Sequence, residues 1–98
     1  MTISGKQIID DFVLKHAQSR NPFTRWKSEI EKVFPTNHNE LKQLFPSADL
    51  VGNKRYVFNI GGNNYRLIAV VMFVEGMIFV RWCGTHAEYS KIEDCSKL

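Results

Sequence analysis

The stretch that decides the fold is residues 54–83, KRYVFNIGGNNYRLIAVVMFVEGMIFVRWC, because its apolar side chains recur at every second position. Alternation of this kind in residues rich in Val, Ile, Tyr and Phe predicts β-strands. The strands expected are residues 54–60, 65–74 and 77–83. The tetrapeptide GGNN (residues 61–64) and the dipeptide EG (residues 75–76) are turn formers, so consecutive strands should form hairpins. The stretch therefore predicts an antiparallel meander.

The sequence before residue 54 has helical periodicity instead. Ser4 followed by Gln7 fits a capping box and predicts the start of an amphipathic helix. Asn21 and Pro22 fit the cap and the first position of a second helix. A short third helix should end before Pro46, because proline cannot continue it. The first two helices are expected to form a hairpin.

The sequence after the last strand predicts one more helix. Thr85 with Glu88 three residues later is a second capping box, opening a helix that should extend to about Ile92. Helices first and strands afterwards are typical of the α+β class. We therefore expect one domain over residues 1–98, in which an N-terminal helical hairpin packs on a small antiparallel β-sheet that is followed by a short C-terminal helix.

The two turns fix a register that assigns side chains to the two faces of the sheet. The first turn places Asn59 opposite Arg66, and a two-residue second turn places Val70 opposite Arg81. One face is then apolar, Trp82 included, and should pack against the helices. The other face should be open, with its arginines exposed. It also carries a strip of apolar residues that would suit a protein partner, namely Ile68, Val70, Met72, Met77 and Phe79.

Extending this register brings five polar side chains together on the open face: Asn59, Arg66, Arg81, His86 and Tyr89. Such a set suits RNA cleavage without a metal ion or cofactor, in which a 2′-OH attacks the neighbouring phosphorus. Arginine binds phosphate oxygens with its fork, histidine transfers protons near neutral pH, and tyrosine orients a group, donates a proton or stacks on a base. The structural alternatives are solvated arginines, an exposed histidine and a tyrosine packed in a small core.

Charge is distributed unevenly along the chain, whose formal net charge is +3. Between residues 54 and 86 the cationic side chains are Lys54, Arg55, Arg66 and Arg81, and the only acid is Glu75. The excess of positive charge in this stretch equals the net charge of the whole chain. An anionic partner should therefore bind the C-terminal half.

Composition excludes several classes of site and of protein. Cys83 and Cys95 are too few for a disulfide framework or a four-ligand zinc site, so neither a metal site nor a cofactor is expected. No apolar run reaches the ~20 residues of a membrane helix. The first residues lack the apolar core of a secretory signal, and a reduced cytoplasm is the expected location.

Two blocks of the sequence resemble the HigB family of mRNA interferases within the RelE-like superfamily: FPSADLVGNKRYVFNIGGNNYRLIAVV (residues 45–71) and GTHAEYSKI (residues 84–92). The similarity extends from about Phe12 to Ile92. It implies a toxin of a type II toxin–antitoxin system that cleaves mRNA on the translating ribosome. It also implies a HigA-like antitoxin with a helix-turn-helix domain. Operator DNA would be contacted only through that antitoxin, and no membrane is involved.

The resemblance also assigns roles to residues. Arg66 falls on the phosphate-binding strand arginine of RelE-like enzymes, and His86 falls near an arginine that follows their last strand. Ser90 stands where the family pattern THxEYDK has an acid, and Val57 and Asn59 stand where RelE has lysines. With the register, the catalytic residues expected are His86, Arg66, Tyr89 and Arg81. The residues expected to bind RNA are Lys54, Arg55, Asn59, Asn63 and Lys91.

Two other functions suit the same fold. A non-enzymatic toxin could inhibit a protein target such as DNA gyrase, as ParE-like relatives do. A basic module could bind RNA or the ribosome without chemistry. A pure binder has no need of a proton-transfer pair, so the presence of His86 with Tyr89 favours the ribonuclease.

Overall fold

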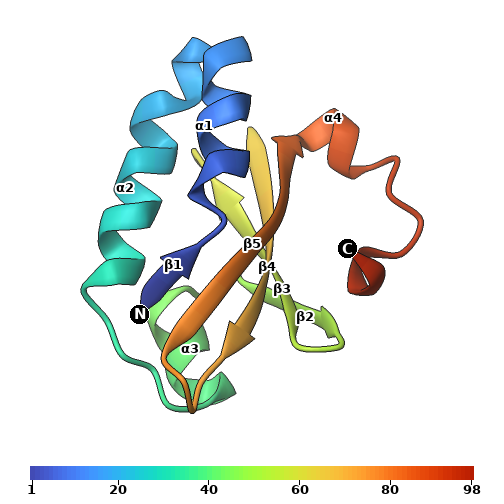
Figure 1. Cartoon of the computed structure of the whole chain (residues 1–98). Helices are drawn as coiled ribbons and strands as arrows, with labels where there is room; N and C mark the ends of the chain where they lie inside the picture. Colours follow the sequence, from blue (N-terminus) through green and yellow to red (C-terminus); the bar gives the residue numbers. More distant parts are fainter.

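The computed structural model describes all residues 1–98 and has an α+β fold built on one five-stranded sheet, with strand order β1-β5-β4-β3-β2 (Figure 1). The strands are β1 (Thr2–Ser4), β2 (Asp49–Gly52), β3 (Arg55–Ile60), β4 (Tyr65–Met72) and β5 (Met77–Thr85). The helices are α1 (Lys6–Lys15), α2 (Arg20–Glu31), α3 (His38–Leu44) and α4 (His86–Tyr89), with 3₁₀ turns η1 (Ala17–Ser19) and η2 (Cys95–Lys97). None of these helices is long and apolar enough to span a bilayer.

The sheet is mixed rather than wholly antiparallel, which corrects the expected architecture. From β2 to β5 each strand runs antiparallel to the next, but β1 runs parallel to β5, with Thr2 opposite Met77. The sequence did not predict β1 and β2 because strands of three and four residues are too short to show alternation.

The first helix begins at Lys6 and not at Ser4, because Ser4 belongs to β1. Its N-cap is Gly5, which has a φ of 86° and makes no side-chain cap. A β-carbon at Gly5 would lie 2.7 Å from the carbonyl oxygen of Val80, so both the left-handed backbone and the close approach to β5 require glycine. The predicted capping box of Ser4 and Gln7 is therefore wrong.

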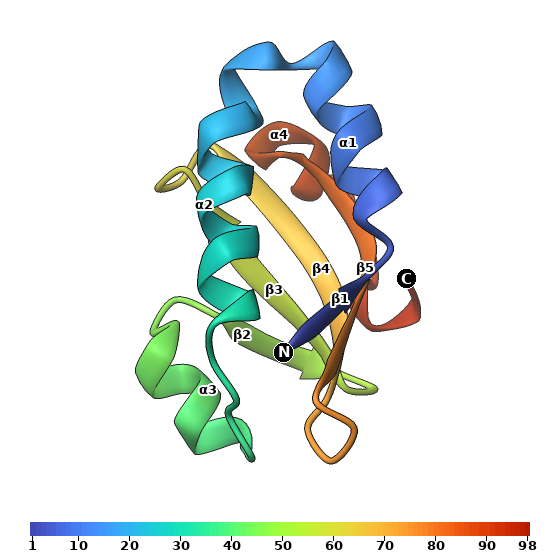
Figure 2. The ribbon, with the colours of Figure 1, turned by 60° about the vertical axis from the view of Figure 1, so that its left-hand side comes forward.

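Helices α1 and α2 cover one face of the sheet, which is called the helical face below (Figure 2). α1 packs against β5, and α2 packs against β1 and β3. Their apolar stripes meet the alternate side chains of the strands, as the periodicity predicted. The largest fully buried members of this core include Ile9, Phe23, Ile30, Phe58 and Leu67.

The first hairpin has the predicted register, with Asn59 opposite Arg66. The second turn is longer than predicted: β4 ends at Met72, which pairs with Met77, and residues 73–76 form the loop. The N–H of Gly76 closes this loop by donating to the carbonyl of Phe73 (3.2 Å). The expected two-residue turn is therefore wrong.

A β-bulge in β5 changes the register once more, around Arg81. Ala69 is opposite Val80 but Ile68 is opposite Trp82, so one extra residue lies between them. The bulge rotates Trp82 away from the helical face, where it was expected, and brings its ring to 6.5 Å from that of Tyr89. The predicted pairing of Arg81 with Val70 is wrong because the longer turn already places Val70 opposite Phe79.

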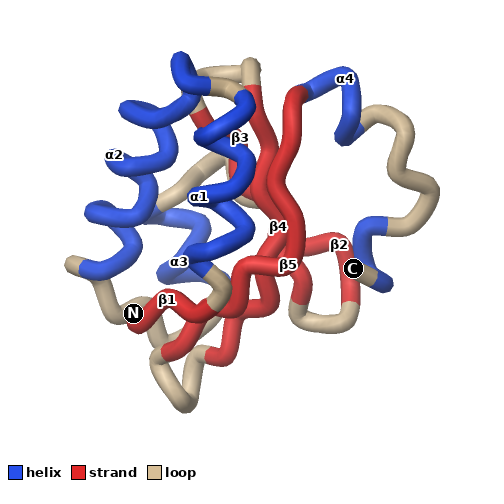
Figure 3. The backbone as a smooth tube through the Cα atoms, turned by 45° about the horizontal axis from the view of Figure 1, so that its top comes forward, coloured by secondary structure: helices blue, strands red, loops and turns tan.

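Residues 86–98, called the C-terminal segment below, fold back over the second face of the sheet (Figure 3). The side chain of Asn53 donates to the carbonyl of Ser96 (3.1 Å), and η2 packs against β2. Beneath the segment Val57 and Ile68 are only 2% and 0% exposed. The expectation of an open second face is therefore wrong.

Candidate active site

Arg66 lies at the start of β4, beside the loop of the β3–β4 hairpin and on the second face of the sheet. Its Nη1 donates to the carbonyl oxygens of Asn63 (3.2 Å) and Tyr65 (3.0 Å), and its Nη2 donates to the side-chain oxygen of Asn63. Only 7% of the residue is exposed, so the expectation of an exposed arginine is wrong. The hairpin loop holds the guanidinium in one orientation.

Tyr89 of α4 covers this guanidinium. The ζ carbon of Arg66 lies 5.6 Å from the centroid of the Tyr89 ring, within the range of a cation–π contact. Burial raises the pKa of the Tyr89 hydroxyl, the neighbouring Cys95 raises it further, and Arg66 partly opposes the rise. The phenol therefore keeps its proton at neutral pH and can donate a hydrogen bond.

His86 is the first residue of α4, and its side chain is exposed. Its backbone N–H donates to the carbonyl of Asn64 (3.0 Å), which is the neighbour of the Asn63 that binds Arg66. The Oγ of Ser90 lies 3.5 Å from Nδ1 of His86 and donates to the His86 carbonyl at 3.0 Å. The rest of the imidazole is free to meet a substrate.

The predicted capping box of Thr85 and Glu88 is confirmed and fixes the start of α4. The Thr85 N–H donates to the Glu88 carboxylate (2.8 Å), and the Glu88 N–H donates to the Thr85 hydroxyl (3.1 Å). The bond from the Thr85 backbone lowers the pKa of the Glu88 carboxyl, so the cap stays charged. The helix ends at Tyr89, earlier than the expected Ile92.

The structure brings only some of the predicted site residues together. Asn63 and Tyr89 contact Arg66, and His86 is joined to the same loop through Asn64. Asn59 is opposite Arg66 on β3, with its side chain exposed. Lys91 is exposed just beyond α4. Asn59, Asn63, Tyr89 and the backbone of His86 thus lie at the loop end of the β3–β4 hairpin.

The other predicted cations lie elsewhere on the second face. The Nε atoms of Arg55 and Arg81 both donate to the main-chain oxygen of Leu98, at 3.0 Å and 3.3 Å. Arg55 is opposite Val70, four residues along β4 from Arg66, which is roughly 13 Å at the usual rise per residue. Lys54 precedes Arg55 in a turn, with a φ of 62°. Arg81 bonds to Leu98 and makes no hydrogen bond to the groups around Arg66; the longer turn and the bulge place it at the Ile68–Ala69 step of β4 instead of opposite Val70.

Sequence reasoning missed three contributions to this site. The carbonyl of Asn64 joins the hairpin to α4, Cys95 lies beside Tyr89, and the C-terminal segment covers Arg66. The tetrapeptide GGNN signals only a turn, and the C-terminal segment has no periodicity that predicts its path. No three His, Cys, Asp or Glu side chains gather in a way that could hold a metal ion.

Comparison with known proteins identifies the family. Residues 19–92 match the HigB toxin family, described as the RelE-like toxic component of a toxin–antitoxin system. The chain is 32% identical over 91 residues to the mRNA interferase toxin HigB of Escherichia coli, covering 91% of this chain and 88% of the relative. The mRNA interferase HigB of Shigella flexneri has the same identity and coverage. A match of 55 residues to the mRNA interferase HigB of Escherichia coli strain CFT073 is 44% identical, over 54% of this chain and 53% of that relative. The chain therefore belongs to the HigB family of RelE-like toxins.

Proposed function

We propose that this chain is an endoribonuclease that cleaves mRNA and thereby stops translation. Its relatives named mRNA interferases supply the class of reaction. The observations that carry the proposal are the contact between the guanidinium of Arg66 and the phenol ring of Tyr89, and the backbone bond that joins His86, whose side chain is exposed, to the hairpin loop that holds Arg66. A cation, a neutral donor and a proton-transfer group are what metal-independent RNA cleavage requires.

Arg66 would stabilise the phosphate as negative charge develops on it. A guanidinium has five N–H donors, and the bonds to Asn63 and Tyr65 use three of them. The N–H of Nε and one N–H of Nη2 remain, which suits two oxygens of one phosphate. Because the hairpin loop already orients the guanidinium, little reorganisation is needed when the substrate arrives.

His86 and Tyr89 would transfer the protons. The 2′-OH loses a proton as it attacks the phosphorus, and the 5′-oxygen gains one as its bond to phosphorus breaks, leaving a 2′,3′-cyclic phosphate and a 5′-OH. The exposed imidazole of His86 can exchange protons near neutral pH. Ser90, in place of the family acid, contacts its Nδ1 and would orient the ring.

Access to Arg66 requires a small movement. With 7% of the residue exposed and the Tyr89 ring above it, a phosphate can reach the guanidinium only when Tyr89 moves aside. We propose that the substrate replaces the cation–π contact with ionic hydrogen bonds, which are stronger. Asn59, Asn63 and Lys91 surround this point and would contact the RNA, whereas Lys54, Arg55 and Arg81 would contact it further along the same face.

The partners follow from the same family. We propose that the chain acts in the cytoplasm on mRNA in the translating ribosome, and that a HigA-like antitoxin with a helix-turn-helix domain neutralises it and alone contacts operator DNA. The paired placement of α1 and α2 over one face supports a helical hairpin of the RelE-like type. Because His86, Tyr89 and Arg66 can fill all three roles, we propose that cleavage needs no metal ion, and EDTA should leave it unchanged in a ribosome-free assay.

The deciding experiment is cell-free translation with mapping of mRNA 5′ ends. We expect new 5′ ends inside translated codons when the wild-type chain is added, and none with His86→Ala. Translation that stops with intact mRNA would instead assign the chain to the toxins that act by binding. Inhibition of DNA gyrase by the same preparation would point to the ParE-like alternative.

A further inference from the structure

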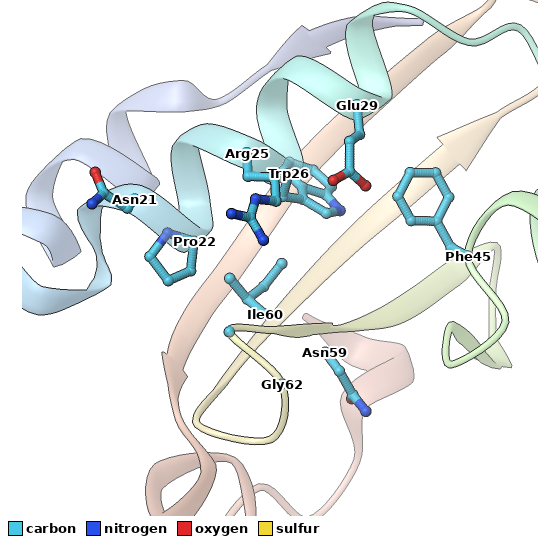
Figure 4. A pocket seen from close by; sticks show the side chains of 10 residues that line it. Asn21, Pro22, Arg25, Trp26, Glu29, Phe45, Asn59, Ile60 and Gly62 are labelled. Carbon is cyan, nitrogen blue, oxygen red and sulfur yellow. The ribbon is translucent and has the colours of Figure 1, made fainter.

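A cavity of about 350 Å³ lies between α2, the end of β3 and the β3–β4 loop, outside the site described above (Figure 4). It exists because β2 pairs with β3 only as far as Val57, which leaves the edge of β3 uncovered from Asn59 to the loop. Ile60, Phe45 and Gly62 line it on the sheet and loop side. The helix α2 closes the opposite side.

The buried indole of Trp26 lines this cavity with an unused donor. Trp26 is 5% exposed, and its Nε1 has no hydrogen-bond partner. The ring is fixed by an edge contact with Phe58, whose centroid is 5.4 Å away. Figure 4 shows the nitrogen on the side of the ring that faces Glu29 and Phe45. Buried donors are nearly always paired, and an acceptor from outside the chain would satisfy this one once the side chains around it move.

Two unpaired charges stand beside this donor. Arg25 and Glu29 line the cavity one helical turn apart, and both are exposed. Neither takes part in any ion pair or side-chain hydrogen bond of the chain, although opposite charges at this spacing often pair. The two charges have opposite signs, so the cavity suits a ligand that offers donors to Glu29 and an acceptor or an anionic group to Arg25.

We propose that this cavity binds a guanine base of the single-stranded mRNA. The inference rests on the proposed function, which supplies RNA as the substrate. Guanine carries two adjacent N–H donors, at N1 and N2, that match the two oxygens of the Glu29 carboxylate, and its O6 acceptor lies next to them for Nε1 of Trp26. Phe45 offers an aromatic surface for the base, as is usual for unstacked bases in RNA-binding proteins. Arg25 then contacts the phosphate of the same nucleotide.

The position of the cavity suits a strand that also reaches Arg66. Asn59 lines the cavity and is opposite Arg66 in the sheet. Gly61 and Gly62 line the cavity, and the next loop residue, Asn63, binds the guanidinium of Arg66. An RNA strand that bends around this loop therefore places one base in the cavity and a nearby phosphate at Arg66. The cavity would set which base stands at a fixed distance from the cut.

The first test is titration of the ¹⁵N-labelled chain with the four nucleoside 5′-monophosphates, followed at the indole N–H signals. We expect guanosine monophosphate to shift the Trp26 signal, which is identified by its loss in Trp26→Phe. Glu29→Gln should weaken this binding at least about tenfold, because a hydrogen bond to a charged group is lost. Glu93→Gln, which changes an exposed carboxylate outside the cavity, should bind as the wild type does.

Three outcomes would overturn the proposal. If inorganic phosphate produces the same shift of the Trp26 signal, the cavity is an anion site. An antitoxin that moves the Trp26 signal when no nucleotide does would make it a protein contact. If no nucleotide shifts the Trp26 signal, the cavity does not bind a base.

The second test separates this inference from the proposed function. Among the mapped 5′ ends, a guanine should be enriched at one fixed distance from the cut, and Glu29→Gln should reduce this enrichment relative to Glu93→Gln. If the wild-type chain makes no cuts, the proposed function fails and the nucleotide titration still decides the nature of the cavity. If cuts occur with no fixed guanine and no nucleotide shifts Trp26, the base site alone is refuted.

Discussion

The two faces of the sheet are buried by different means, and two neighbouring residues of β4 show the difference. Leu67 and Ile68 are both 0% exposed, but Leu67 lies among the core of α1 and α2 while Ile68 lies under the C-terminal segment. The helical face is closed by long amphipathic helices. The second face is closed by thirteen residues with one short helix, held by a few side-chain bonds to backbone carbonyls. Although Leu67 and Ile68 are equally buried, we expect the helical face to have a rigid cover and the second face to have an adaptable cover. The candidate active site is on the second face.

The largest effect should come from truncating these two residues. Large-to-small changes in a core cost about 2–5 kcal/mol, with the lower costs where the surroundings can collapse into the cavity. Leu67→Ala should lie near the upper end and Ile68→Ala near the lower end, because the C-terminal segment can settle onto the sheet and the helices cannot. Urea unfolding of both variants measures the two free energies. Equal losses would show that both covers are equally rigid.

His86→Ala should separate function from stability on the second face. Removing a proton-transfer group lowers the cleavage rate by roughly 10²–10⁴. The free energy of unfolding should change by less than about 0.5 kcal/mol, because the side chain is exposed and touches only Ser90. His86→Gln should not restore cleavage, because an amide cannot carry the proton. His38→Ala is a control for cleavage only, because His38 lies on α3 and its loss also breaks the 2.7 Å bond to the Tyr56 hydroxyl; full cleavage by either His86 variant would remove His86 from the mechanism.

Arg66→Ala should affect both properties. Loss of the phosphate contact should slow cleavage by about 10²–10³. Because the side chain is buried and three of its N–H groups are bonded, the unfolding free energy should also fall by about 1–3 kcal/mol. Circular dichroism and urea unfolding report the second loss while an RNA cleavage assay reports the first. A folded Arg66→Ala variant with wild-type cleavage would contradict the placement of the phosphate at this residue.

Cys83 should make the helical face sensitive to alkaline pH. Burial raises the pKa of its thiol from 9.0 to about 12, and Glu88 adds to the rise. Below pH 9 the thiol is protonated in both states, so its contribution is complete. Between pH 9 and 12 the unfolded chain loses the proton first, which favours unfolding and lowers stability. The urea midpoint should fall over this range, less steeply in Cys83→Ala than in Cys95→Ala, and identical slopes would disprove the role of Cys83.

The same contrast explains how much could be predicted from the sequence. The helical face could be predicted because its apolar residues recur at regular intervals. Alternation in residues 54–83 and helical spacing before them identified the core and the register of the first hairpin. The second face depends on features that leave no regular pattern in the sequence. The bulge at Arg81, the loop at residues 73–76 and the path of the C-terminal segment come from tertiary packing. Arg66 and Tyr89 lie in contact and His86 is bonded to the same loop, because the first hairpin and the Thr85 cap both have local signals, whereas the position of Arg81 depended on the second turn.

The parallel pairing of β1 with β5 has a consequence for the order in which the molecule is made. Thr2–Ser4 are translated long before their partner strand, Met77–Thr85, which lies far along the chain from them. Contacts between such distant segments form late, since the closing of a long loop must precede them. In a nascent chain β1 therefore stays unpaired until β5 has been made. The helix α4, which carries His86 and Tyr89, is made only after β5. On the proposed assignment of His86 and Tyr89, a growing chain lacks the groups that cleave mRNA until α4 has been made, and a partner can bind the incomplete chain during that interval.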